Sequence, residues 1–331
     1  MSDPRQDAPS VARTGPCATE RTGVLVMAHG TPGSPEEIPA FFTSIRRGRS
    51  PQPAELADLE RRYNAIGGTS PLADRTAAQV SMLEGELEKQ FPGRFVVAYG
   101  AKHAHPPIAE AVSMLVGSGV AQAVGIVLAP HYSSMSIGQY ADQARNALAN
   151  SGMPSLPLEL VESWHLEPGL LSLLSDRVAE ATASLPVATR RALVVIFTAH
   201  SLPARLVDEG DPYAVQVEQS ARAVAEQAGV AHWQLAWQSA GKTGGEWLGP
   251  DVRDVITGLA GNGTTAVVVC PIGFVSDHLE TLYDLDIDAA GVARRSGVAF
   301  ARTRALDNDP RLGSVLAQVV AAAADRIGGS W

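Results

Sequence analysis

The sequence predicts an α/β protein of two similar lobes, each a four-stranded parallel sheet flanked by helices, with a cleft between the lobes. Three observations carry this prediction: strand-like segments alternate with helical ones, the alternation fills both halves of the 331 residues, and motifs recur in the same order in each half. Alternating strands and helices are typical of right-handed βαβ units with parallel strands. At about 150 residues per domain, the chain is long enough for two lobes.

The expected strands are short, apolar and rich in β-branched residues, as buried parallel strands are. The first half supplies 23–29, 95–100, 123–130 and 158–163, and the second half supplies 192–200, 233–239, 265–272 and 298–302. The expected helices have apolar residues spaced along one face. They are 35–47, 73–90, 107–117, 137–149, 169–184, 213–228, 249–259 and 276–289, followed by a closing helix at 310–327.

The two halves also repeat each other's motifs. Val24-Leu-Val-Met-Ala-His29-Gly-Thr-Pro parallels Val195-Ile-Phe-Thr-Ala-His200-Ser-Leu-Pro, and weaker parallels link 99–102 with 237–242 and 127–140 with 269–283. We therefore expect a disordered lead-in at 1–21, a first lobe at 22–165 and a second lobe at 166–309. The closing helix, 310–328, is expected to pack back on the first lobe.

Composition excludes several classes of function. The net charge of −9 argues against a general binder of nucleic acid or anionic membranes. No apolar run approaches the ~20 residues of a membrane span, and the lead-in has no apolar core like that of a secretory signal. We therefore expect a cytoplasmic protein.

Bound cofactors are not expected either. Cys17 and Cys270 are too few for the four thiolates of an iron–sulfur cluster, and two reduced thiols suit a cytosolic protein. Gly241-Lys-Thr resembles the end of a phosphate-binding loop, but Ala236 stands where that motif needs glycine. A glycine-rich dinucleotide motif is also missing, so we expect no nucleotide.

One histidine lies where a ligand is expected. His200 ends a predicted buried strand, and open α/β sheets bind ligands just outside the carboxyl ends of their strands. Glu280, Asp284 and Asp288 follow another such strand at a spacing that places them on one face of an α-helix. Imidazole with carboxylates suits Fe²⁺ or Zn²⁺. The alternatives are a hydrogen-bonded structural histidine and a solvated acidic face.

A basic cluster indicates an anionic ligand. Arg46-Arg-Gly-Arg49 and Arg61-Arg62-Tyr63 stand out in an acidic chain, and arginine binds carboxylates through two parallel hydrogen bonds. Ser70-Pro71 then begins a helix whose free N–H groups also suit an anion. The alternative is an ordinary surface patch. His29, the first-lobe counterpart of His200, is expected to face the same cleft from the opposite wall.

Longer motifs surround these residues. They are Phe197-Thr-Ala-His-Ser-Leu-Pro203, Gly273-Phe-Val-Ser-Asp-His-Leu-Glu280, Trp237-Gln-Ser with Trp247-Leu-Gly-Pro250, Tyr63-Asn-Ala-Ile-Gly-Gly-Thr-Ser-Pro-Leu72 and Leu128-Ala-Pro-His-Tyr-Ser133. With these motifs the sequence resembles the ferrochelatases over nearly the whole chain, from about residue 23 to about residue 327. The short chain and its Arg46-Arg-Gly-Arg49 motif are most similar to the soluble type of Gram-positive bacteria, which inserts Fe²⁺ into coproporphyrin III.

The resemblance implies two Rossmann-like lobes around a porphyrin cleft, with His200 and Glu280 at the metal. It implies that Asp284 and Asp288 form an entry track or hold a second cation. His29 stands where that type commonly has tyrosine, the axial ligand of the product iron. The residues expected to contact the tetrapyrrole are Arg46, Arg62, Tyr63, Ser70 and Tyr140.

The resemblance also sets the expected chemistry and its rivals. Four propionates need more basic contacts than two, which favours coproporphyrin III over protoporphyrin IX. A chelatase that loads Co²⁺ or Ni²⁺ into sirohydrochlorin and a non-catalytic haem carrier with His29 as ligand are further alternatives. The expected partners are coproporphyrin III, Fe²⁺ and a downstream enzyme of haem synthesis. Whether His200 accepts a pyrrole proton or holds the iron stays open.

Overall fold

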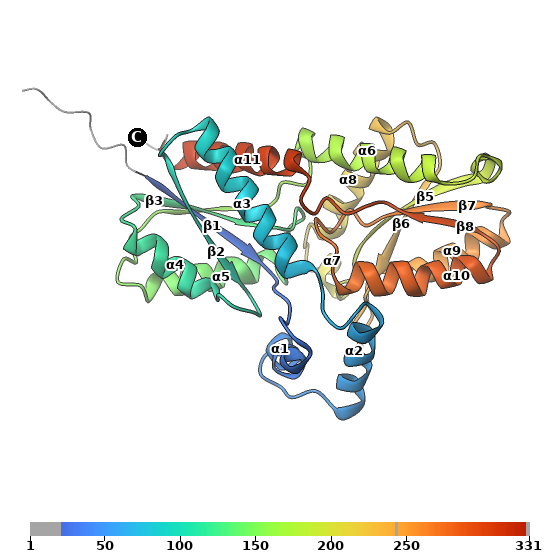
Figure 1. The fold of residues 1–331 in the computed structure, drawn as a ribbon, viewed down its shortest axis with the longest axis horizontal. Coiled ribbons are helices and arrows are strands. Elements are labelled where there is room, and N and C mark those ends of the chain that lie inside the picture. Colours follow the sequence, from blue (N-terminus) through green and yellow to red (C-terminus); the bar gives the residue numbers. More distant parts are fainter. Residues whose placement is uncertain (1–20, 242–243, 329–331) are drawn as a thin grey trace, which may run out of the picture.

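Two four-stranded parallel sheets form the framework of the protein (Figure 1). A computed structural model describes residues 21–241 and 244–328. The strand order is β2-β1-β3-β4 in one sheet and β6-β5-β7-β8 in the other, so the predicted two-lobed α/β fold is confirmed. All of the predicted lead-in except Arg21, together with Lys242 and Thr243, lies outside the described residues.

Each predicted strand is present. The strands are β1 (Thr22–Ala28), β2 (Phe95–Ala101), β3 (Gln122–Val127), β4 (Leu158–Val161), β5 (Leu193–His200), β6 (Trp233–Gln238), β7 (Ala266–Cys270) and β8 (Ala299–Arg302). Strands β1 and β5 are central in their sheets, and each pairs with neighbours on both sides. The residues that follow β1 and β5 therefore lie where ligands are bound in open α/β sheets.

Helices cover the sheets and connect the strands. They are α1 (Ile38–Ile45), α2 (Pro53–Ala65), α3 (Leu72–Gln90), α4 (Ile108–Gly117), α5 (Ile137–Ala149), α6 (Pro168–Ser184), α7 (Arg205–Asp208), α8 (Tyr213–Gln227), α9 (Val252–Gly261), α10 (Ala290–Arg295) and α11 (Pro310–Gly328), with 3₁₀ turns at Pro35–Glu37 and Val187–Ala192.

Helix α2 was not predicted from the sequence. Tyr63 is its one buried residue, so the helix lacks the apolar stripe on which such predictions rest. Its start is nevertheless well specified locally. Pro53 occupies the first turn, and Glu55 Oε2 accepts a 2.8 Å hydrogen bond from the backbone N–H of Gln52. In Figure 1, α1 and α2 project from the body of the protein.

The prediction of an α-helix at 276–289 was wrong. Residues Glu280–Ala289 form a π-helix, which continues into α10. A π-helix bonds i to i+5, is rare beyond a single turn, and is frequent at functional sites. The α-helical spacing used to align Glu280, Asp284 and Asp288 therefore does not describe this segment.

The largest hydrophobic cluster joins the two lobes. It contains Val24 and Val26 of β1 as well as Val195 and Phe197 of β5, together with residues of α3, α6, α8 and α11. Helix α11 packs against α3, β3 and β4 and also against α6. Gly169 allows this approach on α6, since a Cβ there would lie 2.6 Å from Val315 Cγ2. The two sheets thus share one core.

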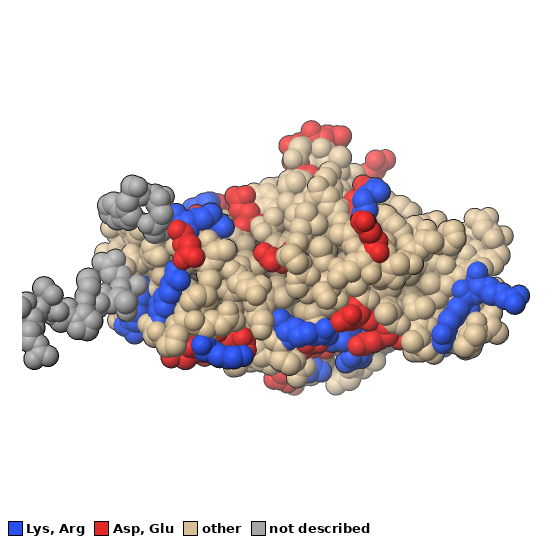
Figure 2. Space-filling model, turned by 90° about the horizontal axis from the view of Figure 1, so that it is seen from above, with Lys and Arg blue, Asp and Glu red and all other residues tan. Residues whose placement is uncertain are grey.

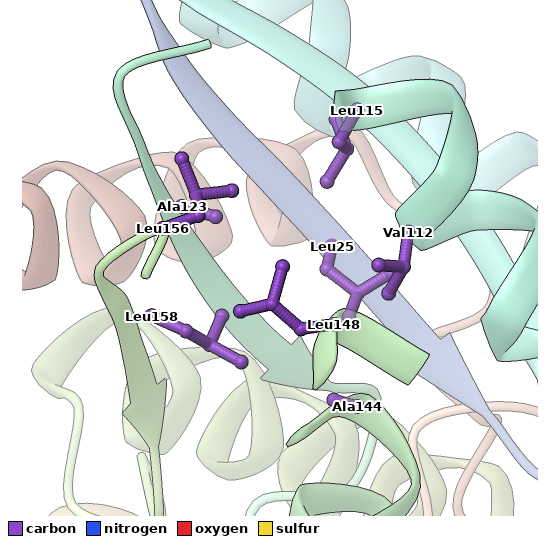
Figure 3. Close-up of a pocket in the computed structure, with 8 residues that line it drawn as sticks. All are labelled: Leu25, Val112, Leu115, Ala123, Ala144, Leu148, Leu156 and Leu158. Carbon is purple, nitrogen blue, oxygen red and sulfur yellow. The ribbon is translucent and has the colours of Figure 1, made fainter. Parts of the chain in front are cut away.

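A small pocket lies inside the first lobe (Figure 3). Its volume is about 10 Å³, far too small for a tetrapyrrole, so it is a packing gap in the core. The side chains around it are all aliphatic: Leu25, Val112, Leu115, Ala123, Ala144, Leu148, Leu156 and Leu158.

Charge on the surface is mixed in sign. Figure 2 shows basic and acidic side chains interleaved on the face seen from above, with wide uncharged areas between them. The net charge of −9 is therefore not gathered in one acidic field on this face. In the part of the chain that the structure describes, no helix is long and apolar enough to span a membrane.

A buried histidine lies at the contact between the lobes. His131 is 3% exposed, and its Nε2 is 3.0 Å from Ser220 Oγ on α8. The titratable groups that face its ring are His165, at 5.6 Å between ring centroids, and Tyr213, at 6.3 Å. Burial, reinforced by the charge of His165, lowers the pKa of His131 to about 3. His131 therefore stays neutral in the folded protein under most conditions.

We expect this histidine to weaken the fold in acid. Between pH 6.5 and about pH 3 the unfolded chain binds a proton at His131 that the folded protein does not bind. As the pH is lowered through this window, the free energy of unfolding should decrease by up to about 1.4 kcal/mol per pH unit because of this group. Urea unfolding at several pH values measures the slope. His131→Gln, which cannot be protonated, should have a shallower slope, and an unchanged slope would contradict the assignment.

Candidate active site

The centre of the site is a histidine–carboxylate pair contributed by two segments of the second lobe. His200 is the last residue of β5, and Glu280 is the first residue of the π-helix. His200 Nδ1 lies 2.9 Å from Glu280 Oε2. The two side chains remain 33% and 29% exposed, so a solute can reach them. The sequence predicted both residues, and the structure brings them into direct contact.

The two groups favour opposite charges on each other. Burial disfavours the charged form of His200, but the charge and hydrogen bond of Glu280 outweigh it, and the pKa of His200 is raised. Burial likewise opposes the carboxylate of Glu280, yet His200 and then His278 hold the pKa of Glu280 well below its ordinary value. A metal bound to His200 would compete with a proton for the ring nitrogen.

Backbone contacts fix both members of the pair. Gln238 ends β6 beside β5 and donates from Nε2 to the carbonyl of Glu280 at 3.0 Å, while its Oε1 accepts from Thr198 Oγ1 at 2.8 Å. The Tyr213 hydroxyl donates to the carbonyl of His200 at 3.1 Å. Sequence reasoning did not select these residues. The position of Gln238, at the carboxyl end of the strand next to β5, could have indicated it.

A second histidine lies beside Glu280. His278 Nε2 is 3.7 Å from Glu280 Oε2, and its Nδ1 is 3.1 Å from the carbonyl of Ser276. A carbonyl only accepts, so Nδ1 carries a proton. The ring also packs against Phe274, with centroids 4.7 Å apart. His278 was quoted within a motif but not predicted as a site residue, although its spacing of two residues from Glu280 was visible.

His29 approaches the site from the first lobe. It follows β1, is exposed, and its Nδ1 lies 3.2 Å from the carbonyl of Gly30. Nδ1 must donate to this carbonyl, so Nε2 keeps its lone pair. Desolvation of the ring by the surrounding protein lowers the pKa of His29 to about 4, although the negative charge of Glu280 acts in the opposite direction. The charge of Glu280 in the second lobe therefore acts on His29 in the first.

The two acids of the predicted entry track, Asp284 and Asp288, have different partners. Asp284 accepts hydrogen bonds from Arg62 Nη2 and Ser239 Oγ, and Ser239 has the left-handed φ of 59°. Burial raises the pKa of Asp284, although Arg62 opposes the shift. Asp288 is half-buried and interacts with the charge of Arg253. In the described residues, no group of three or more His, Cys, Asp or Glu side chains is arranged to hold a metal ion.

The predicted tetrapyrrole contacts on α2, Arg62 and Tyr63, pack against the π-helix. Tyr63, which is 2% exposed, shares a hydrophobic cluster with Ile38, Leu279 and Tyr283. The guanidinium of Arg62 lies 5.0 Å from the centroid of the Tyr283 ring. The charge of Glu280 contributes to the raised pKa of Tyr63, after burial itself. Arg62, Tyr63 and Glu280 are therefore brought together.

Arg46 lies at the end of α1 and is held by α2. Its Nη1 donates to Glu55 Oε1 at 3.1 Å, and its guanidinium stacks on Phe42. Ser70 is 8% exposed and uses its hydroxyl oxygen to accept from the N–H of Leu72 at 3.2 Å. The hydroxyl thus stabilises the first turn of α3.

Tyr140 is enclosed by the first lobe. It is 4% exposed, belongs to the core of that lobe and lies under the ammonium of Lys102, which is 4.9 Å from the ring centroid. Burial, followed by the charge of Arg47, lowers the pKa of Lys102 to about 8. Lys102 also acts on the charge of His29, so this cation belongs to the first-lobe wall of the site.

Solved structures define the class of fold. The chain is similar to the sirohydrochlorin chelatase SirB from Bacillus subtilis subspecies spizizenii in complex with cobalt, with a TM-score of 0.56 at 11% identity over 94% of this chain and 98% of that chain. It is also similar to CbiX, described as the terminal enzyme for biosynthesis of siroheme in denitrifying bacteria, with a TM-score of 0.50 at 13% identity over 91% and 99%. The protein thus has the fold of the chelatases.

Sequence comparison gives the family. The family model Ferrochelatase matches residues 21–324. The coproporphyrin III ferrochelatase of Geobacillus kaustophilus is 43% identical over 90% of this chain and 94% of that protein, and the one of Bacillus subtilis is 43% identical over 91% and 97%. The ferrochelatase of Herpetosiphon aurantiacus is 38% identical over 91% and 98%. The chain belongs to the ferrochelatase family.

Proposed function

We propose that the protein inserts Fe²⁺ into coproporphyrin III and yields iron coproporphyrin III in haem biosynthesis. The observation that carries the proposal is the open pair of His200 and Glu280 at the carboxyl end of β5. Relatives named coproporphyrin III ferrochelatase, 43% identical to this chain, support the choice of tetrapyrrole.

The reaction needs groups that handle a cation and two protons. Four Fe–N bonds form as the two pyrrole N–H protons leave, and the ring must bend so that nitrogen lone pairs point toward the metal. Binding of the peripheral carboxylates provides the free energy for that distortion. We assign Fe²⁺ delivery and proton acceptance to His200 and Glu280, which combine an imidazole and a carboxylate in hydrogen-bond contact.

We assign the axial position on the product iron to His29. Its Nε2 keeps a lone pair because Nδ1 donates to the carbonyl of Gly30. Its low pKa, about 4, keeps the ring neutral at physiological pH. A neutral imidazole is a stronger iron ligand than a protonated phenol, so release of product is expected to depend on this residue.

We propose that the basic residues bind the propionates. Arg46 and Arg62 now pair with Glu55 and Asp284, and a propionate would compete for each guanidinium. Release of Arg62 from Asp284 would leave that carboxylate free for a hydrated cation, and we propose Asp288, further along the π-helix, as a second acid of this track. Tyr63, Ser70 and Tyr140 remain proposed tetrapyrrole contacts.

Further expectations complete the proposal. We place the division between the lobes at residue 165, with a first lobe of 22–165, a second lobe of 166–309 and the helix 310–328 packed on the first. We propose a cytoplasmic monomer that needs no nucleotide or iron–sulfur cluster. A downstream enzyme of haem synthesis is the proposed acceptor of the product. The resemblance to the soluble type of ferrochelatase supports these points.

The choice of tetrapyrrole has a direct test. Purified protein is offered Fe²⁺ under anaerobic conditions with coproporphyrin III, protoporphyrin IX or, with Co²⁺, sirohydrochlorin, and the change in absorbance is followed. We expect kcat/KM for coproporphyrin III to exceed that for protoporphyrin IX by at least about tenfold, or about 1.4 kcal/mol of transition-state binding. A preference for protoporphyrin IX or sirohydrochlorin would overturn the substrate assignment. Tight binding without metallation would indicate a carrier.

A further inference from the structure

A buried amide of the first lobe contacts the segment that presents Glu280. Gln79 lies on α3 and is 1% exposed. Its Nε2 is 2.8 Å from Ser276 Oγ, 2.8 Å from the carbonyl of Asp307 and 3.2 Å from the carbonyl of Val275. All three acceptors belong to loops of the second lobe. One loop connects β7 to the π-helix, and the other follows β8.

The orientation of this amide is fixed by its partners. The carbonyls of Val275 and Asp307 can only accept, so the nitrogen of Gln79 must face them. Two N–H groups serve three acceptors, which means that one hydrogen is shared. Gln79 Oε1 is buried and has no hydrogen-bond partner among the described residues. An unpaired buried oxygen costs about 1–3 kcal/mol, so a leucine of similar size would satisfy packing alone at lower cost.

The turn that Gln79 contacts, residues 275–281, contains His278 and Glu280 of the candidate active site. The carbonyl of Ser276 accepts from His278 Nδ1, and the N–H of Asp277 donates to Asp307 Oδ1 at 2.9 Å. The N–H of His278 donates to Thr281 Oγ1 at 2.9 Å, and this bond closes the turn that ends at the π-helix. Gln79 thus donates hydrogen bonds to both loops, which the bond between Asp277 and Asp307 also links. This network sets the positions of His278 and Glu280.

We propose that Gln79 is a positioning residue for metal insertion, through which the first lobe holds His278 and Glu280 in register with the tetrapyrrole. Gln79 does not itself contact substrate. Helix α3 begins beside Ser70, and α2 supplies Arg62, so the lobe proposed to bind the tetrapyrrole also contacts the turn before the π-helix. The inference rests on the proposed function, because the alignment of the two lobes matters only if a tetrapyrrole bound by one lobe must meet a metal bound by the other.

Gln79→Leu tests the inference, since it keeps the volume and removes the donors. We expect kcat for Fe²⁺ insertion into coproporphyrin III to fall at least about tenfold, while KM for coproporphyrin III changes by less than about threefold. The matched control is Gln216→Leu, which also removes a side-chain amide that makes a hydrogen bond between the lobes. In that bond the N–H of Tyr132 donates to Gln216 Oε1 at 2.7 Å. Because that bond involves no residue of the turn before the π-helix or of the loop at Asp307, the control should keep its kcat.

A second variant covers the case in which Gln79→Leu does not fold. Ser276→Ala removes one acceptor from the other side of the contact and should lower kcat about two- to fivefold. In the double variant the losses should be less than multiplicative, because both changes remove the same bond. Unchanged kcat in Ser276→Ala together with either unchanged kcat or failure to fold in Gln79→Leu would overturn the inference. Equal losses in Gln79→Leu and the Gln216→Leu control would do the same.

Hydrogen exchange separates this inference from the proposed function. In the full-length protein without substrate, Gln79→Leu should speed exchange of the Asp277 and Thr281 amides at least about tenfold, and Gln216→Leu should not. Faster exchange in a protein that lacks chelatase activity would leave the positioning role intact and reject the function. Unchanged exchange with full chelatase activity would reject the positioning role alone.

Discussion

Replacing His200 by alanine is expected to lower kcat for iron insertion by at least about a hundredfold, as is usual for loss of a proton-transfer or metal-binding group. The ring of His200 is the partner of Glu280 at 2.9 Å, so its removal leaves that carboxylate without this hydrogen-bond partner. Glu280→Gln keeps the shape and removes the charge, and we expect a loss of similar size. Absorbance change with Fe²⁺ and coproporphyrin III under anaerobic conditions measures both.

His232→Ala is the control for this experiment, because that histidine is exposed and precedes β6. It should keep the wild-type rate. The division of roles can be read from the same data. A raised KM for Fe²⁺ with little change in kcat indicates that the residue holds the metal, whereas a loss in kcat alone indicates proton transfer. If His200→Ala and Glu280→Gln both kept the full rate, the assignment of the active site would be wrong.

Asp309→Ala is expected to cost about 3–5 kcal/mol of folding free energy, because it leaves a buried guanidinium without its main partner. Arg177 on α6 is 5% exposed and donates to Asp309 Oδ2 at 2.7 Å. Its other carboxylate, Glu180, is 46% exposed and holds it less firmly. Asp309 also accepts from the N–H of Arg311 at 3.0 Å, which caps the start of α11. Urea unfolding monitored by circular dichroism measures the loss.

Two further variants separate the contributions. Asp309→Asn keeps an acceptor for the cap and removes the charge, so its loss should be smaller than that of alanine. Asp176→Ala breaks a 2.6 Å ion pair with Arg311 in which both side chains are about half exposed, and such pairs contribute about 0–1 kcal/mol. A loss below about 1 kcal/mol for Asp309→Ala would show that Arg177 finds adequate solvation without Asp309.

Much of the framework could be predicted from local patterns. The eight strands are mostly apolar because helices cover both faces of each sheet, and this is visible in the sequence. Helix α2 escaped prediction because it buries Tyr63 alone and so has no apolar stripe. The π-helix escaped because its hydrogen-bond pattern depends on how Thr281, Tyr283, Leu285 and Ala289 are buried against neighbouring elements.

The candidate site was predicted only in part, for a related reason. His200 and Glu280 were found because His200 ends one strand-like segment and Glu280 comes in the segment after another, and the carboxyl ends of parallel strands meet at one edge. Gln238 and His278 carry weaker signals of the same kind. Gln79 carries none, since a glutamine on an amphipathic helix ordinarily faces water, and only its burial against Ser276 and Asp307 gives it a role.

The sequence by itself determined the two α/β halves, the positions of their strands along the chain and the identity of the histidine and the acids. Tertiary structure alone decided the order of the strands in each sheet. It also decided how distant residues combine: His200 with Glu280 across 80 positions, Arg62 with Asp284 across 222, and residues of both sheets in the largest core cluster. The physical reason is range. Periodicity and turn chemistry report on neighbours a few residues apart, whereas charge pairing and burial depend on which distant segments the packed core brings together.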